Sequence, residues 1–182
     1  MKAVSHATAL EVVTMSIFGV SLVLLYTSST LYHAMHLSKH KRHFQVLDHG
    51  FIFVLIAGTY TPLVLGPLRS PIGWALFGIV WGLAILGFVL KAIYLPHYAK
   101  PTSFLYLVMG WLIVFAAREI SENLSPLAIR WLVAGGLCYS IGIIFFILDR
   151  IKYMHAVWHL FVLAGSICHF FAVFYGVIQT AK

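Results

Sequence analysis

Residues 72–95 read IGWALFGIVWGLAILGFVLKAIYL, and this stretch decides the fold class. It carries a single charged residue, Lys91, close to its end. About 20 consecutive apolar residues are enough to cross the hydrocarbon core of a bilayer as a helix. The stretch therefore predicts a transmembrane helix.

Similar apolar stretches fill most of the chain. The sequence predicts six transmembrane helices, at about 10–33, 44–65, 72–95, 102–118, 127–148 and 155–179. Prolines or charged clusters separate them, and both end a membrane helix because proline lacks an N–H donor and charge seeks water. We expect an all-α, polytopic transmembrane bundle in which residues 1–182 form one integral membrane domain.

The composition supports the same class of protein. The chain of 182 residues is 62% hydrophobic and 9% charged, whereas about a quarter of the residues of a soluble domain are charged. The net charge of +7 lies in short loops between apolar stretches, which is typical of membrane topology and not of nucleic-acid binding. The first apolar stretch is too long for a signal peptide, and no cleavage site follows it. Two cysteines, Cys138 and Cys168, fall within apolar stretches, and we expect them to be packing residues.

Lysine and arginine are distributed unequally between the two membrane faces. The ends of the first, third and fifth helices carry Lys39, Lys41, Arg42, Lys91, Lys100, Arg150 and Lys152, against Lys2, Arg69, Arg118, Arg130 and Lys182 on the opposite side. The positive-inside rule places the richer side in the cytosol, so both termini are expected to face out.

Four ionisable residues lie within the predicted membrane helices or at their ends, where the lipid environment disfavours charged groups. His33 ends the first helix, Asp48 lies early in the second, and His155 and His159 begin the sixth. Such residues cost about 2.5–3.5 kcal/mol on insertion scales, which makes them candidates for function. The direction of each helix places all four at one level, on the cytosolic side. Their convergence at one level does not depend on the Lys and Arg count.

The spacing of these residues suggests a metal site. His155 and His159 are four residues apart, so both imidazoles lie on one helix face and can reach a single ion. With His33 they make three imidazoles with an open fourth position, as in catalytic zinc sites. Zinc lowers the pKa of its bound water to about 7, and a carboxylate such as Asp48 can accept the proton. Ser29 lies one turn before His33 on the same face.

Simpler interpretations exist for each residue alone. A single histidine on an apolar face is usually a hydrogen-bonded core residue, Asp48 could be favoured by the helix dipole, and Ser29 could bond to its own backbone. His36, His40 and His43 also show short spacings and are typical of a solvated basic turn. Only the joint placement carries the zinc hypothesis.

Haem is a second cofactor to weigh. His155 and His169 are fourteen residues apart on one helix face, a spacing that could stack two haems, but each haem needs a partner histidine at the same depth. The third to fifth helices contain no histidine and the second offers His49 near its start, so we expect no haem.

Four ordered motifs resemble those of the hemolysin III family, the bacterial relatives of the progestin and adipoQ receptors. They are Ser28-Ser29-Thr30-Leu31-Tyr32-His33, Leu47-Asp48-His49 with Ala57-Gly58-Thr59-Tyr60-Thr61-Pro62, Tyr106-Leu107-Val108-Met109-Gly110-Trp111, and His155-Ala156-Val157-Trp158-His159 with Gly165-Ser166 and His169. The resemblance covers nearly the whole chain. The family usually has seven helices, so the first helix is expected to be absent here.

The resemblance implies a zinc ion held at His33, His155 and His159. It also implies that Asp48 and Ser29 contact the zinc-bound water or lie close to it. The wider superfamily includes alkaline ceramidases, which suggests hydrolysis of a lipid amide in membrane-lipid homeostasis. The expected location is the bacterial inner membrane, with the metal site toward the cytosol.

Three functions are compatible with these residues. The first is an intramembrane zinc hydrolase, the second a receptor-like lipid sensor with structural zinc, and the third a cytolysin. The cytolysin ranks last because a secreted toxin needs a soluble state, which so apolar a chain lacks. Membrane lipids are the expected substrates or ligands, and no large protein ligand is expected because nearly all loops are short. The oligomeric state is left open by the sequence.

Overall fold

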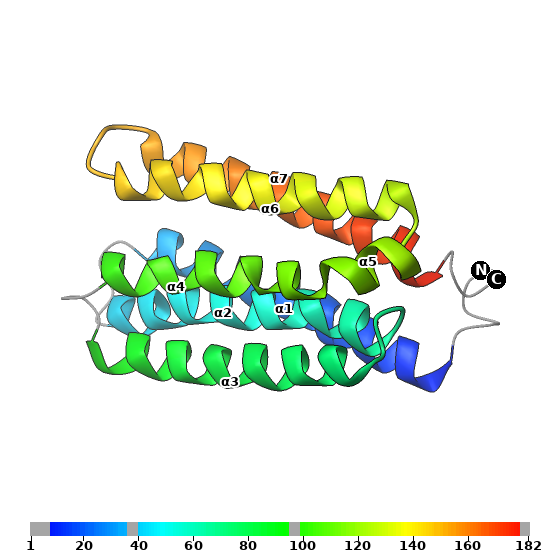
Figure 1. The fold of residues 1–182 in the computed structure, drawn as a ribbon. Coiled ribbons are helices and arrows are strands. Elements are labelled where there is room, and N and C mark those ends of the chain that lie inside the picture. The colour runs from blue at the N-terminus through cyan, green and yellow to red at the C-terminus, as the bar shows by residue number, and fades with distance from the viewer. Residues whose placement is uncertain (1–7, 36–39, 95–98, 179–182) are drawn as a thin grey trace. The chain divides into compact units, whose positions relative to one another are not determined.

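The computed structural model describes residues 8–35, 40–94 and 99–178, with side chains in the last range from Phe104 to Val177. Over these residues the protein is helical throughout, without a strand (Figure 1). The elements are α1 (Ala9–Ala34), α2 (Lys41–Leu65), α3 (Pro71–Tyr94), α4 (Ala99–Trp111), a 3₁₀ segment η1 (Leu112–Ala116), α5 (Ala117–Asn123), α6 (Pro126–Ile147), α7 (Met154–Val173) and a π-helical turn η2 (Phe174–Ile178). The expectation of an all-α membrane fold is confirmed.

Six helical segments in the described part of the chain are long and apolar enough to cross a membrane. Five of them begin and end within a few residues of the predicted helices. The fourth, Phe104–Asn123, extends beyond the predicted end at 118 and includes η1 and α5. The polar residues predicted to break the helix form its last turn instead. Arg118 pairs with Glu122 one turn later at 2.9 Å, a contact that favours the helix slightly.

The chain divides into two compact units. The N-terminal unit is Thr8–Met109, and the C-terminal unit is made of the described residues from Gly110 onward.

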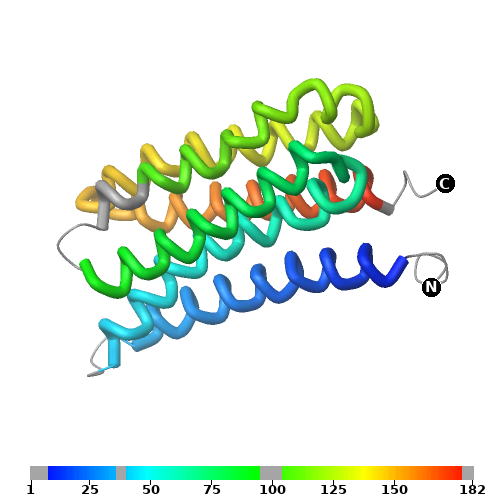
Figure 2. The backbone as a smooth tube through the Cα atoms, turned by 60° about the horizontal axis from the view of Figure 1, so that its bottom comes forward, coloured from blue at the N-terminus to red at the C-terminus, as the bar shows by residue number. Residues whose placement is uncertain are grey.

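In the N-terminal unit, α2 packs against both α1 and α3. Figure 2 shows that the chain reverses direction from α1 to α2 and again from α2 to α3. Two glycines allow the close approach. A Cβ atom on Gly58 would lie 2.4 Å from Oγ of Ser21 in α1, and one on Gly87 of α3 would lie 2.5 Å from the ring of Phe53. Small residues at such contacts are the usual basis of helix association in membranes.

The face of α1 that packs toward α2 carries hydroxyl residues at intervals of seven. Thr14, Ser21 and Ser28 are buried, and each donates a hydrogen bond to a carbonyl of α1 itself, at 3.1, 2.7 and 2.9 Å. Their hydroxyl protons are therefore satisfied within one helix, and the side chains meet α2 as small groups.

The fourth helix joins the N-terminal unit through aromatic residues. The hydroxyl of Tyr106 donates to the carbonyl of His49 at 2.8 Å, and its ring lies 4.4 Å from that of Phe53. Lys91 is only 1% exposed, and its Nζ lies 5.4 Å from the Tyr106 ring centroid. Lys91 was assigned to a basic helix end, but it is enclosed within the unit one turn before α3 ends.

The C-terminal unit is built on the pair α6 and α7. Glycines again admit large side chains of the facing helix: a Cβ on Gly142 would lie 2.9 Å from Phe161, and one on Gly165 would lie 2.9 Å from the ring of Tyr139. The turn between the helices ends at Tyr153, whose φ of 72° is left-handed. Because α7 begins at the next residue, this turn fixes where His155 emerges.

A candidate metal-binding site

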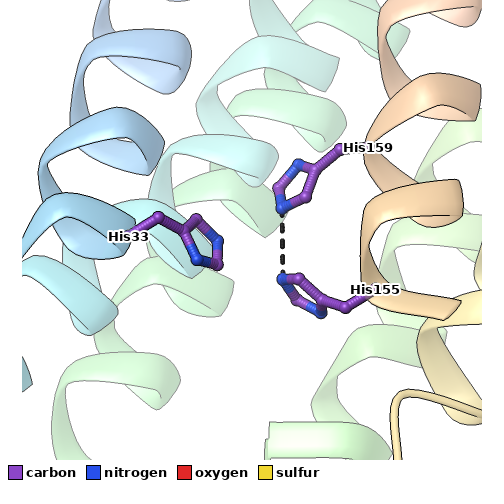
Figure 3. Close-up of side chains that lie close together, drawn as sticks. All are labelled: His33, His155 and His159. Carbon is purple, nitrogen blue, oxygen red and sulfur yellow. Dashed lines mark hydrogen bonds between the residues drawn. The ribbon is translucent and has the colours of Figure 1, made fainter. Parts of the chain in front are cut away.

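The first part of the candidate site is a pair of histidines at the start of α7. His155 and His159 are half-buried, one turn apart on the same helix face. Their Nε2 atoms face each other at 3.1 Å, and their rings meet edge to face with centroids 4.8 Å apart (Figure 3). The predicted convergence of these two side chains is therefore present in the C-terminal unit.

The separation of the two Nε2 atoms suits a shared metal ion. A zinc–nitrogen bond is about 2.0–2.1 Å long, so two nitrogens on one tetrahedral zinc lie about 3.3 Å apart. The observed 3.1 Å is close to that value and needs only a small adjustment. Neutral imidazoles are also the commonest metal ligands in proteins.

The residues around His155 add a carboxylate that sequence analysis used only to mark the end of a helix. Asp149, in the turn before α7, interacts electrostatically with His155. The centroid of the Phe146 ring lies 6.4 Å from that of His155. A carboxylate near a ligating histidine commonly orients the ring and fixes its tautomer. The position of Asp149 in a short turn just after the end of α6 gave no sign of this role.

The second part of the candidate site lies in the N-terminal unit. Asp48 of α2 is buried, with 7% of its surface exposed, and the hydroxyl of Ser29 in α1 donates a hydrogen bond to its carboxylate. The structure therefore brings together Ser29 and Asp48 as a hydrogen-bonded pair. This contact makes the simple interpretation of Ser29, bonding only to its own backbone, insufficient.

His33 and Tyr32 complete this part. His33 lies one turn after Ser29 near the end of α1 and is exposed. The ring of Tyr32 meets that of His33 edge to face at 4.9 Å, and its phenol interacts electrostatically with Asp48. Tyr32 is a neighbour of the site that sequence analysis did not single out, although it stands within the quoted motif.

In the described part of the chain, His33, His155 and His159 are the one group whose ligand chemistry could hold a metal ion, and Figure 3 labels all three. The other short-spaced histidines do not join it. His40 and His43 are exposed at the beginning of α2, with ring centroids 6.0 Å apart, and His36 lies outside the described residues.

Comparisons with known proteins identify the family of the chain. A model of the family described as haemolysin-III related matches residues 1–170. The chain is similar to Hemolysin-3 of Bacillus cereus, at 46% identity over 97% of this chain and 81% of the relative. It is also similar to the Hemolysin-3 homolog of Bacillus subtilis strain 168, at 44% identity over 97% of this chain and 83% of the relative.

A more distant relative comes from an animal. The human Monocyte to macrophage differentiation factor is 32% identical over 90% of this chain and 70% of its own length. No solved structure matches the chain. The match of the family model over most of the chain, with two Hemolysin-3 relatives and six membrane-spanning helices, shows that this chain is an integral membrane protein of the haemolysin-III-related family.

Proposed function

We propose that the chain is a zinc-dependent hydrolase of membrane lipids, with the metal held by His33, His155 and His159. The observation that carries this proposal is the 3.1 Å separation of Nε2 in His155 and His159. Three imidazoles that leave one position open are a ligand set of catalytic zinc sites, whereas structural sites use four protein ligands. Imidazole nitrogen suits zinc better than it suits magnesium or calcium.

The number of spans supports the participation of His33. The chain reaches one membrane face at the end of α1, leaves it with α2, and returns to the same face after the third and fifth spans. α7 therefore starts from the face at which α1 ends. His33 ends the first span and the histidine pair begins the sixth, so this topology is expected to bring them to the same membrane face, where a single ion is their simplest common ligand.

Asp48 is assigned the proton transfers. Zinc in such a site supplies Lewis acidity and activates water at neutral pH. Asp48 accepts a proton from the attacking water, whose oxygen bonds to the acyl carbon, and returns the proton to the amine as the carbon–nitrogen bond breaks. Ser29 holds the Asp48 carboxylate in position through its hydrogen bond. The products are a fatty acid and an amine.

The substrate class follows from where these residues lie. All of them belong to helices that can span the membrane, and the outward surface of α7 carries exposed Leu160, Leu163 and Phe170. A molecule dissolved in the bilayer can approach such a site sideways. The amide linkage is inferred from the resemblance to the superfamily of alkaline ceramidases. We place the site toward the cytosolic leaflet, on the face predicted by the basic residues.

Metal analysis of the purified protein tests the ligand set. We expect about one zinc ion per chain, and replacement of His33, His155 or His159 by alanine should remove most of it. His43→Ala is the matched control, because His43 is an exposed histidine near the start of α2. Equal metal loss from the control would move the metal away from the proposed ligands.

Asp48→Asn separates a hydrolase from a protein with a structural metal. Asparagine keeps the shape of the side chain but cannot take a proton. The variant should retain zinc, with a decrease in affinity of at most about 10–100-fold, and should lose about 10²–10⁴-fold in hydrolysis rate. Glu122→Gln is the control, since that carboxylate is exposed and paired with Arg118. The assay is release of fatty acid from ceramide-like and other acyl-amide lipids in reconstituted bilayers.

Two results together would end the hydrolase proposal. One is that zinc-loaded wild type turns over none of these lipids, and the other is that Asp48→Asn still complements a deletion strain. A receptor-like lipid sensor with structural zinc would then be the better description.

A further inference from the structure

A second polar cluster lies between α6 and α7, away from the proposed metal site. The hydroxyls of Tyr139 and Ser166 share a hydrogen bond of 2.8 Å, and the rings of Tyr139 and His169 meet edge to face at 5.3 Å. His169 is ten residues beyond His159, or about 15 Å along the helix. This cluster is therefore deep in the membrane span Met154–Val177 and is not used by the proposed chemistry.

One edge of the His169 ring packs against α6 and is hydrogen-bonded to it. Its Nε2 lies 3.3 Å from the carbonyl oxygen of Leu132. A Cβ on Gly135 would lie 2.1 Å from Cδ2 and 2.5 Å from Nε2 of His169, so this edge occupies the space that the glycine leaves. A carbonyl oxygen can only accept, so Nε2 carries the proton and donates it to Leu132.

The opposite edge of the ring is not satisfied. Because Nε2 is protonated in a neutral imidazole, Nδ1 carries a lone pair and is an acceptor. Nδ1 of His169 is buried and has no hydrogen-bond partner among the residues that the structure describes. Buried polar atoms in folded proteins nearly always have a partner, including ordered water, so an acceptor left alone in an apolar span points to a missing donor.

The chemistry of this atom restricts the ligand. An acceptor excludes phosphodiesters, carboxylates and ketones, which offer no proton. Among the described residues, His169 does not belong to a group of three metal ligands, so an ion has too few partners here. What remains is a small group with a proton to donate, and a hydroxyl is the simplest such group.

We propose that the α6–α7 pair binds one hydroxyl group on Nδ1 of His169, beside the Tyr139–Ser166 hydrogen bond. The hydroxyl belongs either to a water molecule or to a membrane alcohol such as a diacylglycerol. This site does not depend on the proposed zinc hydrolysis, so the two proposals can be tested separately.

The test is nitrogen NMR of the wild-type protein labelled with ¹⁵N-histidine. The protein is reconstituted in bilayers of a phosphatidylcholine, which has no hydroxyl group, with and without 1,2-dioleoylglycerol. The expected result is an unprotonated Nδ1 whose resonance is shifted by a hydrogen bond. A shift in phosphatidylcholine alone, with a cross peak to water, supports water; a shift that needs the diacylglycerol supports the lipid alcohol.

Two other results overturn the proposal. One is a bare imine nitrogen at Nδ1 in both bilayers, and the other is a proton on Nδ1 in place of Nε2. His169→Gln assigns the resonance, because its amide can still donate toward Leu132 but offers no acceptor at the Nδ1 position. If that variant does not fold, the contact between Nε2 and the ¹³C-labelled Leu132 carbonyl assigns the wild-type signal instead. His40, which is exposed, is the reference for a water-exchanging imidazole.

Discussion

Gly135→Ala should destabilise the C-terminal unit because the new methyl group has no space. Its Cβ would lie 2.1 Å from Cδ2 of His169, whereas carbon atoms in contact are about 3.5–4.0 Å apart. The ring must therefore move by more than about 1 Å, which costs about 1–3 kcal/mol as overpacking. The same movement breaks the 3.3 Å hydrogen bond to Leu132, worth about 0.5–1.5 kcal/mol. We expect a total loss of about 2–4 kcal/mol.

A double-mutant cycle identifies the cause of that loss. His169→Ala removes the ring, so alanine at position 135 then meets no obstacle. The double variant should be about 2–4 kcal/mol more stable than the sum of the two single effects, because the whole loss is attributed to His169. The free energy of unfolding is measured by circular dichroism in mixed micelles, with Gly136→Ala as control, since a Cβ there meets nothing within 4 Å. Additive effects, within about 0.5 kcal/mol, would refute the assignment of the clash to His169.

Two further predictions concern the N-terminal unit and the topology. Tyr60→Phe should cost about 1–3 kcal/mol of unfolding free energy, because the buried Tyr60 hydroxyl donates to the carbonyl of Met109 at 2.8 Å and the acceptor would lose this bond. Tyr153→Phe is the control and should be near neutral in the same titration, because Tyr153 is 68% exposed and its contact with Lys152 uses the ring. A cysteine placed at Arg69 should react with an impermeant thiol reagent in intact cells, whereas one at Arg150 should be protected, and the reverse labelling pattern would invert the proposed orientation.

The positions of the membrane helices were predictable because hydrophobic length and helix-ending residues act locally. The structure differs from these predictions where interactions between turns or between helices determine the conformation. α5 continues to Asn123, and Arg118 and Glu122 pair across one turn, although the same charges were expected to end the helix. Lys91 was placed at a basic helix end, because the sequence does not show that Tyr106 would enclose its side chain. The 3₁₀ segment Leu112–Ala116 had no signal in an otherwise uniform apolar stretch.

The candidate site could also be predicted in part from the sequence. The convergence of His155 and His159 follows from helix geometry alone, and the structure places their Nε2 atoms 3.1 Å apart. The hydrogen bond between Ser29 and Asp48 depends on how α1 packs against α2, which only the resemblance could suggest beforehand. Asp149 was missed because a carboxylate in a turn is usually just solvated. The catalytic and metal-binding roles of these residues are still predictions.

The internally bonded hydroxyls of α1 have a consequence for the order in which the protein is assembled during synthesis. Since Thr14, Ser21 and Ser28 donate to carbonyls of their own helix, α1 can leave the translocation machinery and enter lipid with these protons satisfied. α2 differs, because it has the lowest hydropathy of the six spans and carries buried Asp48. The insertion of α2 is therefore expected to require contact with a helix that is already in the bilayer. α1 is that helix, because it is synthesised before α2 and its Ser29 donates a hydrogen bond to Asp48.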